Sequence, residues 1–227
     1  ARAKKVREDF QLTPDNAREV LQICHRLDGL PLAIELATSR IRAMDTTELL
    51  HSMEQRLAVL EGEGDDLLDH QRSLRELISW SYDLLTEDEQ TLWRRMAVFT
   101  GGFAMEAAEE VCDPDDDFVV DIEVEGLVDK SLATLTFKPS EDGDEEARVN
   151  MLDTLREFAL NKLDEVGESE QFRERFCNWV VELAEESIEQ LRGAKSDSRI
   201  ARLELEQINL QAAIDYCRGK PDPDWNR

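Results

Sequence analysis

Hydrophobic positions recur at helical spacing along most of the chain, and this spacing is interrupted by a sharp corner near residue 29. Apolar side chains gather on one helical face before the corner (Ala17, Val20, Leu21, Cys24 and Leu27) and again after it (Ala33, Leu36, Ala37, Ile41 and Met44). Gly29 stands where a helix end favours positive φ, and Pro31 suits the first position of the next helix. The pattern predicts a helical hairpin with a rigid elbow at residues 28–31.

Polar residues mark where other helices begin. Thr13 and Pro14 predict the start of the first helix of the hairpin, with the threonine as its cap. Asp45–Glu48 and Thr86–Glu89 both have the spacing of a capping box, so each predicts the start of a further helix. Two glycines and a run of acids at residues 61–70 predict a domain boundary.

The pattern changes after this boundary. Helical spacing continues in four segments, at residues 74–85, 87–96, 105–112 and 118–129. Two β-like runs follow, 131–137 and 148–152, joined by a polar turn; helices followed by such a hairpin are typical of a winged helix. Helical patterns then return at 154–166, 171–190 and 200–217. We therefore expect a mainly helical fold in three domains: a helical domain (1–64), a winged helix with a small β-hairpin (65–165) and a helical, repeat-like arm (166–227).

Composition restricts the classes of protein that fit. The chain has 227 residues, of which 41% are apolar, so it can bury hydrophobic cores. No run approaches the roughly 18 apolar residues of a membrane span, and a reducing cytoplasm is the simplest compartment. The net charge of −25 opposes contact with nucleic acid or an anionic membrane. Residues 71–164 alone carry 9 basic and 24 acidic side chains, a balance of −15.

Candidate catalytic and metal-binding residues do not form a site. The chain has no glycine-rich phosphate loop ending in Gly-Lys-Ser/Thr, so we expect no nucleotide hydrolysis by this chain alone. His25, His51 and His70 are scattered, and the four cysteines form no Cys-x-x-Cys pair. The acidic run at 113–117 lacks the glycine and terminal glutamate of a calcium loop. We expect no catalytic residue and no metal ligand.

Longer stretches of sequence carry a family resemblance. The segment around the elbow reads CHRLDGLPLAIELA and resembles the GLPL motif of the STAND signalling ATPases, the class that includes NB-ARC switch proteins. Further on, SWSYDLLTEDEQTLWRRMAVFTGGF and LVDKSLATL look like the winged helix that follows this motif in bacterial STAND regulators. LELEQINLQAAIDY resembles the lead-in to their repeat-helix sensor arrays. The resemblance covers nearly all of residues 10–217.

The resemblance implies two groups of nucleotide-facing residues in an intact protein. The first is the elbow, Gly29, Leu30, Pro31 and Leu32, and the second is the end of the hairpin, Met151, Leu152 and Asp153. The family has Met-His-Asp at the second position, so Leu152 replaces a histidine that reaches the phosphates of ADP. Leucine cannot donate a hydrogen bond. Two alternatives stay open: Met151 and Leu152 as strand core, and Asp153 as a helix cap.

The implied function is a regulatory segment of a longer switch protein. A nucleotide-binding domain upstream would bind and hydrolyse ATP, and a repeat domain downstream would sense an inducer. An activation-dependent oligomer is compatible with this scheme, and the sequence does not decide it. This segment would itself hold no cofactor, whereas the intact protein would hold ATP or ADP. It would contact no nucleic acid and no membrane. The alternatives are a DNA-binding winged-helix transcription factor and a purely structural adaptor between proteins.

Overall fold

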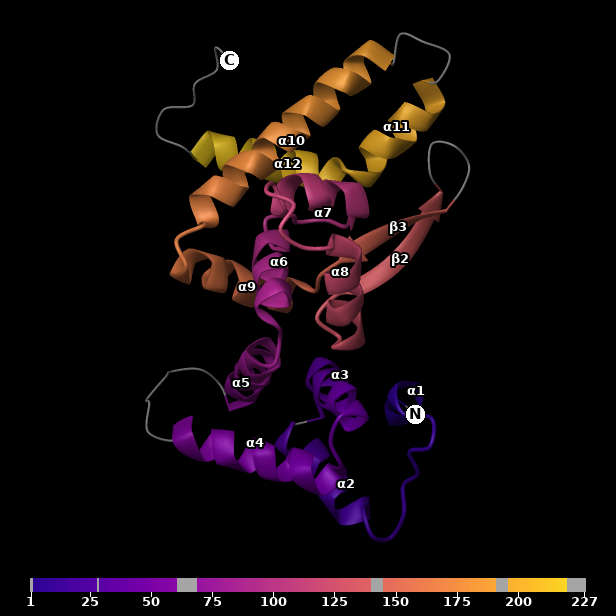
Figure 1. Cartoon of the computed structure of the whole chain (residues 1–227), viewed down its shortest axis with the longest axis vertical. Helices are drawn as coiled ribbons and strands as arrows, with labels where there is room; N and C mark the ends of the chain where they lie inside the picture. The colour runs from indigo at the N-terminus through magenta and orange to yellow at the C-terminus, as the bar shows by residue number, and fades with distance from the viewer. Residues whose placement is uncertain (1, 28, 61–68, 140–144, 191–195, 220–227) are drawn as a thin grey trace. The chain divides into compact units, whose positions relative to one another are not determined.

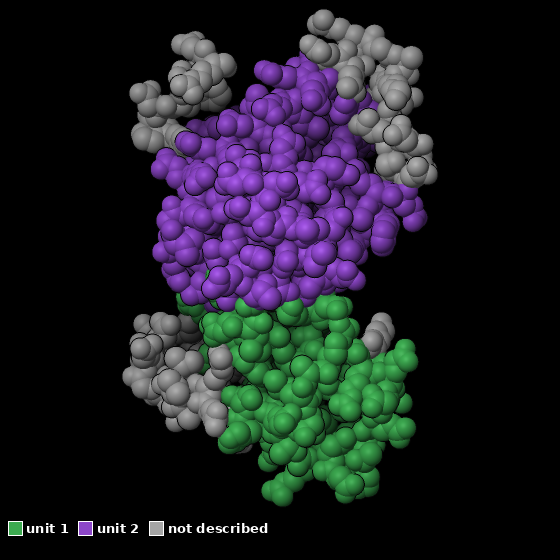
Figure 2. All heavy atoms as spheres, viewed as in Figure 1, with its two compact units in different colours: residues 1–85, 129–132 green, residues 86–128, 133–227 purple. Residues whose placement is uncertain are grey.

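A computed structural model describes residues 2–27, 29–60, 69–139, 145–190 and 196–219. Its helices and strands fall into two compact units, residues 1–85 with 129–132 and residues 86–128 with 133–227 (Figures 1 and 2). The predicted boundary at 61–70 lies mostly outside the described residues. The division into three domains remains a prediction.

The first unit is entirely helical in its described part. It contains α1 (Arg2–Val6), α2 (Ala17–Arg26), α3 (Pro31–Ser39), the short 3-10 helix η1 (Arg40–Arg42), α4 (Thr46–Leu60) and α5 (Asp69–Asp83). Contacts link α2 with α4 and α3 with α5, so the predicted hairpin α2–α3 packs on the two helices that follow it. The core includes Leu27, Leu36 and Leu49, each at most 2% exposed.

The start and inner face of α2 differ from the prediction. The helix begins at Ala17 rather than at Thr13, because the side chain of Asn16 closes the preceding turn: its Oδ1 accepts the N–H of Thr13 at 2.9 Å. Leu21, predicted to be on the buried face, is 71% exposed. The buried stripe is centred on Ile23 and Leu27, and a position two residues from Ile23 lies on nearly the opposite side of a helix.

Both predicted capping boxes are confirmed. The N–H of Asp45 donates to Oε2 of Glu48 at 3.0 Å, and the N–H of Glu48 donates to Oδ1 of Asp45 at 2.8 Å. Thr86 and Glu89 exchange the corresponding pair of bonds at 2.9 and 3.1 Å. These bonds satisfy N–H groups that a helix start otherwise leaves without a partner.

The second unit combines helices with a small antiparallel sheet. Its elements are α6 (Glu87–Met96), β1 (Phe103–Ala104), α7 (Met105–Cys112), α8 (Val120–Asp129), β2 (Thr134–Pro139), β3 (Glu145–Asn150), α9 (Asp153–Glu165), α10 (Ser169–Gln190), α11 (Ser196–Leu205) and α12 (Gln207–Gly219). The last residue of α8 belongs to the first unit. The prediction of a mainly helical fold with a small hairpin is confirmed.

The sheet has the strand order β1-β3-β2. The predicted hairpin is β2–β3, with Leu135 opposite Val149, and β1 adds a third strand that the hydrophobic pattern did not indicate, with Phe103 opposite Val149. An aromatic cluster joins this sheet to α10, because the ring of Phe99 lies 4.1 Å from Phe103 and 5.3 Å from Phe176. Within the described ranges, no helix combines the length and apolar composition that crossing a membrane requires.

The segment predicted as one helix over 200–217 is two helices. α11 ends at Leu205 and α12 begins at Gln207, so the break falls at Glu206. The side chain of Glu206 is fully buried in a polar network, described below, that fastens the start of α12 to the sheet. This anchoring gives a physical reason for the break.

Candidate functional site

The predicted elbow has the expected backbone geometry. Gly29 has a φ of +68°, and Leu30, at φ −62° and ψ 122°, is the extended residue before Pro31, which opens α3. The N–H of Gly29 donates to the carbonyl of Cys24 at 3.2 Å, closing the end of α2. A Cβ at Gly29 would have no atom within 4 Å, so the positive φ, not crowding, favours glycine here. Asp28 lies outside the described residues.

The elbow residues are accessible. Gly29 and Pro31 are exposed, while Leu30 and Leu32 are half-buried. The backbone there is fixed by the hydrogen bond from the N–H of Leu30 to the carbonyl of Leu27 at 2.8 Å and by the proline ring. The elbow is thus a rigid, partly apolar corner on the surface of the first unit.

The other predicted residues lie where β3 leads into α9. Met151 is half-buried, Leu152 is 52% exposed, and Asp153 is exposed. Leu152 is therefore not a core residue, and Asp153 is the first residue of α9 rather than its cap. Leu152 occupies the cap position and its side chain makes no capping hydrogen bond. The N–H groups of the first turn of α9 are thus left without a side-chain cap.

One basic side chain stands in this first turn. Nη1 of Arg156 donates to the carbonyl of Ala97 at 3.1 Å. Burial lowers the pKa of Arg156, Asp153 opposes that change, and the positive charge of Arg173 adds to it. The two predicted groups, Gly29–Leu32 and Met151–Asp153, belong to different compact units.

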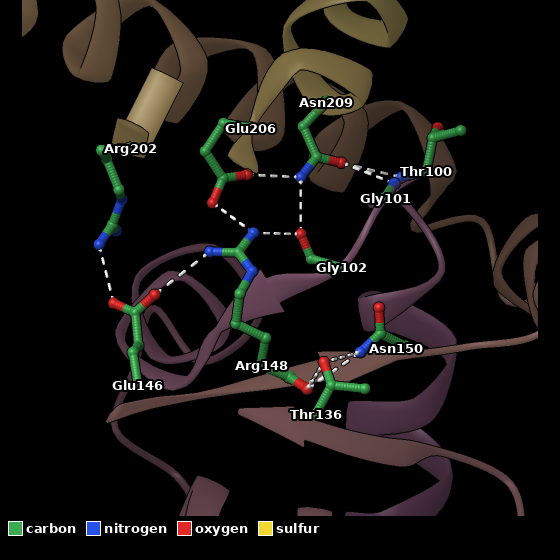
Figure 3. A network of polar contacts seen from close by, with 10 residues as sticks. All are labelled: Thr100, Gly101, Gly102, Thr136, Glu146, Arg148, Asn150, Arg202, Glu206 and Asn209. Atoms are coloured by element: carbon green, nitrogen blue, oxygen red, sulfur yellow. Dashed lines mark hydrogen bonds and ion pairs between the residues drawn. The ribbon is translucent and has the colours of Figure 1, made fainter. Parts of the chain in front are cut away.

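An extensive polar site in the described part of the second unit was not predicted. It is a buried network centred on Arg148 of β3, with partners from the Gly101–Gly102 turn and from α11 and α12 (Figure 3). Nη2 of Arg148 lies 2.6 Å from Oε1 of Glu206 and also donates to the carbonyl of Gly102. Arg148 is 3% exposed and Glu206 is fully buried.

A second ion pair lies at the edge of this network. Glu146 accepts from Nη1 of Arg148 at 3.3 Å and from Nη1 of Arg202 at 2.8 Å. Together with Glu206, the network therefore contains two cations and two carboxylates, so its charges balance. Balanced, hydrogen-bonded charges are the form in which ionic groups can be buried without a large net cost.

Asn209 completes the network at the start of α12. Its Oδ1 accepts the N–H groups of Thr100 and Gly101 at 3.1 and 2.9 Å. Its Nδ2 donates to Oε2 of Glu206 at 2.6 Å and to the carbonyl of Gly102 at 3.2 Å. Both ends of this one side-chain amide are thus used to fasten α12 to the glycine turn.

The two glycines permit this close approach. A Cβ on Gly101 would lie 3.1 Å from Cβ of Ile208, and a Cβ on Gly102 would lie 2.4 Å from Oδ1 of Asn150. The Gly101–Gly102 pair therefore lets the first turn of α12 and the edge of β3 contact the backbone of the turn.

No group of three or more His, Cys, Asp or Glu side chains in the described residues is arranged to hold a metal ion. Burial raises the pKa of the Cys112 thiol far above its ordinary value, which makes that cysteine a poor nucleophile. The network around Arg148 connects strand β3 and the glycine turn with the start of α12.

Comparison with known proteins gives similarity over nearly the whole chain. The chain is 36% identical over 219 residues, or 96% of its length, to a protein of Mycobacterium tuberculosis (strain ATCC 25618 / H37Rv) and to one of Mycobacterium bovis. Each is named "Putative HTH-type transcriptional regulator". The matched segment is 24% of those proteins. The chain resembles one segment of these regulators.

A second group of relatives is shorter. The chain is 35% identical over 184 residues, 77% of its length, to an uncharacterized protein of Mycobacterium tuberculosis, and this segment is 44% of that protein. No protein-family model matches the sequence. The chain thus spans only about a quarter of the length of the named regulators and less than half of this second relative.

Proposed function

We propose that this chain is the regulatory, non-catalytic part of a bacterial transcription regulator that switches with bound nucleotide, in the manner of the STAND class. Similarity over 96% of the chain to proteins named as HTH-type transcriptional regulators supports the regulatory role. The GLPL elbow and the winged-helix-like order of helices and hairpin support the finer assignment. In this proposal the chain connects an upstream ATPase domain with a downstream sensor arm in the cytoplasm.

The observation that carries the proposal is the position of the buried network. Arg148 lies three residues before Met151, on the strand that leads to the predicted nucleotide-facing residues. Its buried partner Glu206 lies between the two helices of the arm, α11 and α12. A displacement of these helices is therefore transmitted to β3 unless the network breaks. This is the connection that a sensor needs to influence a nucleotide site.

Both predicted groups have properties that suit a nucleotide wall. Pro31 and Leu152 are exposed apolar side chains, available to a base or ribose in the intact protein. The uncapped N–H groups at the start of α9 favour negative charge nearby, as helix N-termini do. Asp153 in the same turn opposes that preference, so a phosphate contact here would depend on the neighbouring groups. Binding of ATP or ADP would require the upstream domain, because this chain has no phosphate loop.

DNA binding is the second function to weigh, because the named relatives are described as HTH-type. Helix α8 is the candidate recognition helix of a winged helix, but its sequence VDIEVEGLVD contains no basic residue. Binding a duplex requires several Lys or Arg on one face. We therefore assign DNA contact to another part of the intact regulator. A purely structural adaptor would need no nucleotide-facing elbow.

Nucleotide retention in the intact protein tests the proposal. The intact regulator would be purified with radiolabelled ADP, and the fraction retained after gel filtration would be compared between wild type and Pro31→Ala. The matched control is Pro14→Ala, an exposed proline in the turn before α2. We expect faster ADP loss only with Pro31→Ala. Equal ADP retention in the wild type, Pro31→Ala and Pro14→Ala would mean that the elbow has only a structural role. That result would favour the structural adaptor.

A further inference from the structure

Helix α8 has two apolar faces, and only one of them belongs to the core. On the inner face, Val124 and Leu127 are fully buried. On the outer face, Ile122 is 62% exposed, and Val119, the residue directly before the helix, is 59% exposed. The carbonyl of Val119 accepts the N–H of Ile122 at 3.0 Å, so the two residues are neighbours where the helix begins. Since the inner residues already anchor the helix, the exposed pair is not needed to hold it in place.

Acidic residues flank this exposed pair in the sequence. Residues 113–128 contain seven acidic side chains and no basic one. The exposed carboxylates belong to Asp115, Asp116, Asp117, Asp121 and Glu125. An exposed apolar pair flanked by carboxylates is complementary to a surface that is both apolar and positively charged.

The loop that leads into α8 is held in a defined conformation. Oδ1 of Asp113 accepts the N–H of Asp117 at 2.9 Å. Asp116 adopts a positive φ of 56°, a conformation that aspartate tolerates better than most residues. The backbone of the loop is thus fixed next to the start of the helix, which lowers the ordering cost of binding a charged partner there.

We propose that Val119, Ile122 and the exposed carboxylates of residues 115–125 form a docking face for a basic amphipathic helix of a partner protein. We call this surface the α8 docking face; helix α8 itself is labelled in Figure 1. Apolar residues of the partner would cover Val119 and Ile122, and its Lys or Arg residues would pair with the exposed carboxylates. Nucleic acid would offer the wrong charge, and a second copy of this chain, at −25, would be repelled. This inference goes beyond the proposed switch and does not rest on nucleotide binding.

A designed peptide provides the probe. It is helical and built from leucine and lysine, with the leucines on one face, and it carries a fluorophore for anisotropy titration against the whole chain at physiological salt. The test variants are Val119→Ser and Ile122→Ser. Ile188→Ser on α10 is the matched control, because Ile188 is 57% exposed and follows the exposed residues Glu185 and Glu186.

We expect the peptide to bind the wild type and Ile188→Ser equally, and to bind Ile122→Ser at least about tenfold more weakly, a loss of roughly 1.4 kcal/mol. A second peptide of the same composition, with its leucines scattered around the helix, should bind weakly to every protein. Hydrogen exchange with the first peptide should show protection at residues 119–126 and not at 181–188. Circular dichroism of each variant confirms that its fold is intact.

Three results would overturn the proposal. Equal affinity for all variants would mean that the peptide is held by net charge alone. Equal affinity of the two peptides for the wild type would mean that the exposed pair Val119 and Ile122 is not recognised. Binding of random duplex DNA that Ile122→Ser abolishes would assign this face to nucleic acid instead.

Discussion

Arg148 and Glu206 are 58 residues apart in sequence, yet their side chains meet at 2.6 Å and neither is more than 3% exposed. They join strand β3 to the junction of α11 and α12. The pair is surrounded by other polar groups, since Glu206 also accepts from Asn209 and Arg148 also donates to Gly102 and Glu146. Its removal therefore tests how firmly the arm is attached to the sheet.

Removing one partner of this pair should destabilise the second unit strongly. In Glu206→Leu, Arg148 would keep its charge in a buried place with only Glu146 as a charged partner. Breaking a buried pair in this way costs about 3–5 kcal/mol. We expect a decrease of this size in the free energy of unfolding of Glu206→Leu, measured with urea near neutral pH. The double variant Arg148→Met/Glu206→Leu should recover much of that loss, because no buried charge is then left uncompensated.

The exposed pair Lys162–Glu165 gives the control for this measurement. Its side chains are 28% and 60% exposed, and Lys162→Met should cost less than about 1 kcal/mol. If Glu206→Leu costs no more than Lys162→Met, the arm is not fastened through this network. The mechanical basis of the proposed switch would then be lost.

The glycine turn should tolerate substitution poorly. In Gly102→Ala, the new Cβ would lie 2.4 Å from Oδ1 of Asn150, so the asparagine side chain would have to move. Asn150 would then lose its bonds to Thr136 and to the carbonyl of Arg148, both at 3.0 Å. We expect a loss of about 1–3 kcal/mol in thermal or urea unfolding. The double variant Gly102→Ala/Asn150→Ala should have nearly the same free energy of unfolding as Asn150→Ala alone, because the clash disappears with the asparagine side chain.

Local signals in the sequence predicted local structure well. The capping boxes at Asp45–Glu48 and Thr86–Glu89 each involve residues three positions apart, and the helix Met105–Cys112 has the predicted bounds. The elbow was visible for the same reason, since glycine permits a positive φ and proline fixes φ without the help of distant contacts.

Features that depend on distant contacts were not predicted. Strand β1 has only two residues, too few to show alternation, and it exists because Phe103 pairs with Val149. In a chain with 52 acidic residues, nothing in the sequence distinguishes Glu206 from solvated carboxylates, although its burial accompanies the break between α11 and α12. The nucleotide-facing residues came from the family resemblance, and their accessibility is what the structure adds.

Stability should depend on the ionisation of Glu110. Burial and then the nearby carboxylates Glu182 and Glu186 raise the pKa of Glu110 above its ordinary 4.5, while Arg175 opposes the change. The folded protein therefore holds this proton more tightly than the unfolded chain. The resulting stability is present below pH 4.5 and is lost as the pH rises through the raised pKa.

Glu110→Gln should consequently raise the melting temperature at neutral pH and have little effect at pH values below the ordinary pKa. The gain should be a few tenths of a kcal/mol, as is usual near a surface, and should shrink in high salt. Glu109→Gln, an exposed neighbour on α7, removes the same charge and serves as the control. If Glu109→Gln raised the melting temperature more than Glu110→Gln does, the destabilising repulsion between carboxylates would not be centred on Glu110.

Leu152→His tests whether nucleotide phosphates come within reach of the start of α9 in the intact protein. Leu152 is 52% exposed, so the substitution should change the free energy of unfolding by no more than about 0.5 kcal/mol. A histidine there could donate a hydrogen bond that leucine cannot, and it would gain positive charge as the pH falls through about 6.5. ADP retention in Leu152→His should therefore exceed that of the wild type and should increase from alkaline toward acidic pH. Leu152→Gln is the matched control, because it adds a donor without a titratable charge and should show no such pH dependence. If Leu152→His and Leu152→Gln retain ADP equally at every pH, no phosphate lies near residue 152, and the nucleotide-facing assignment of Met151–Asp153 is wrong.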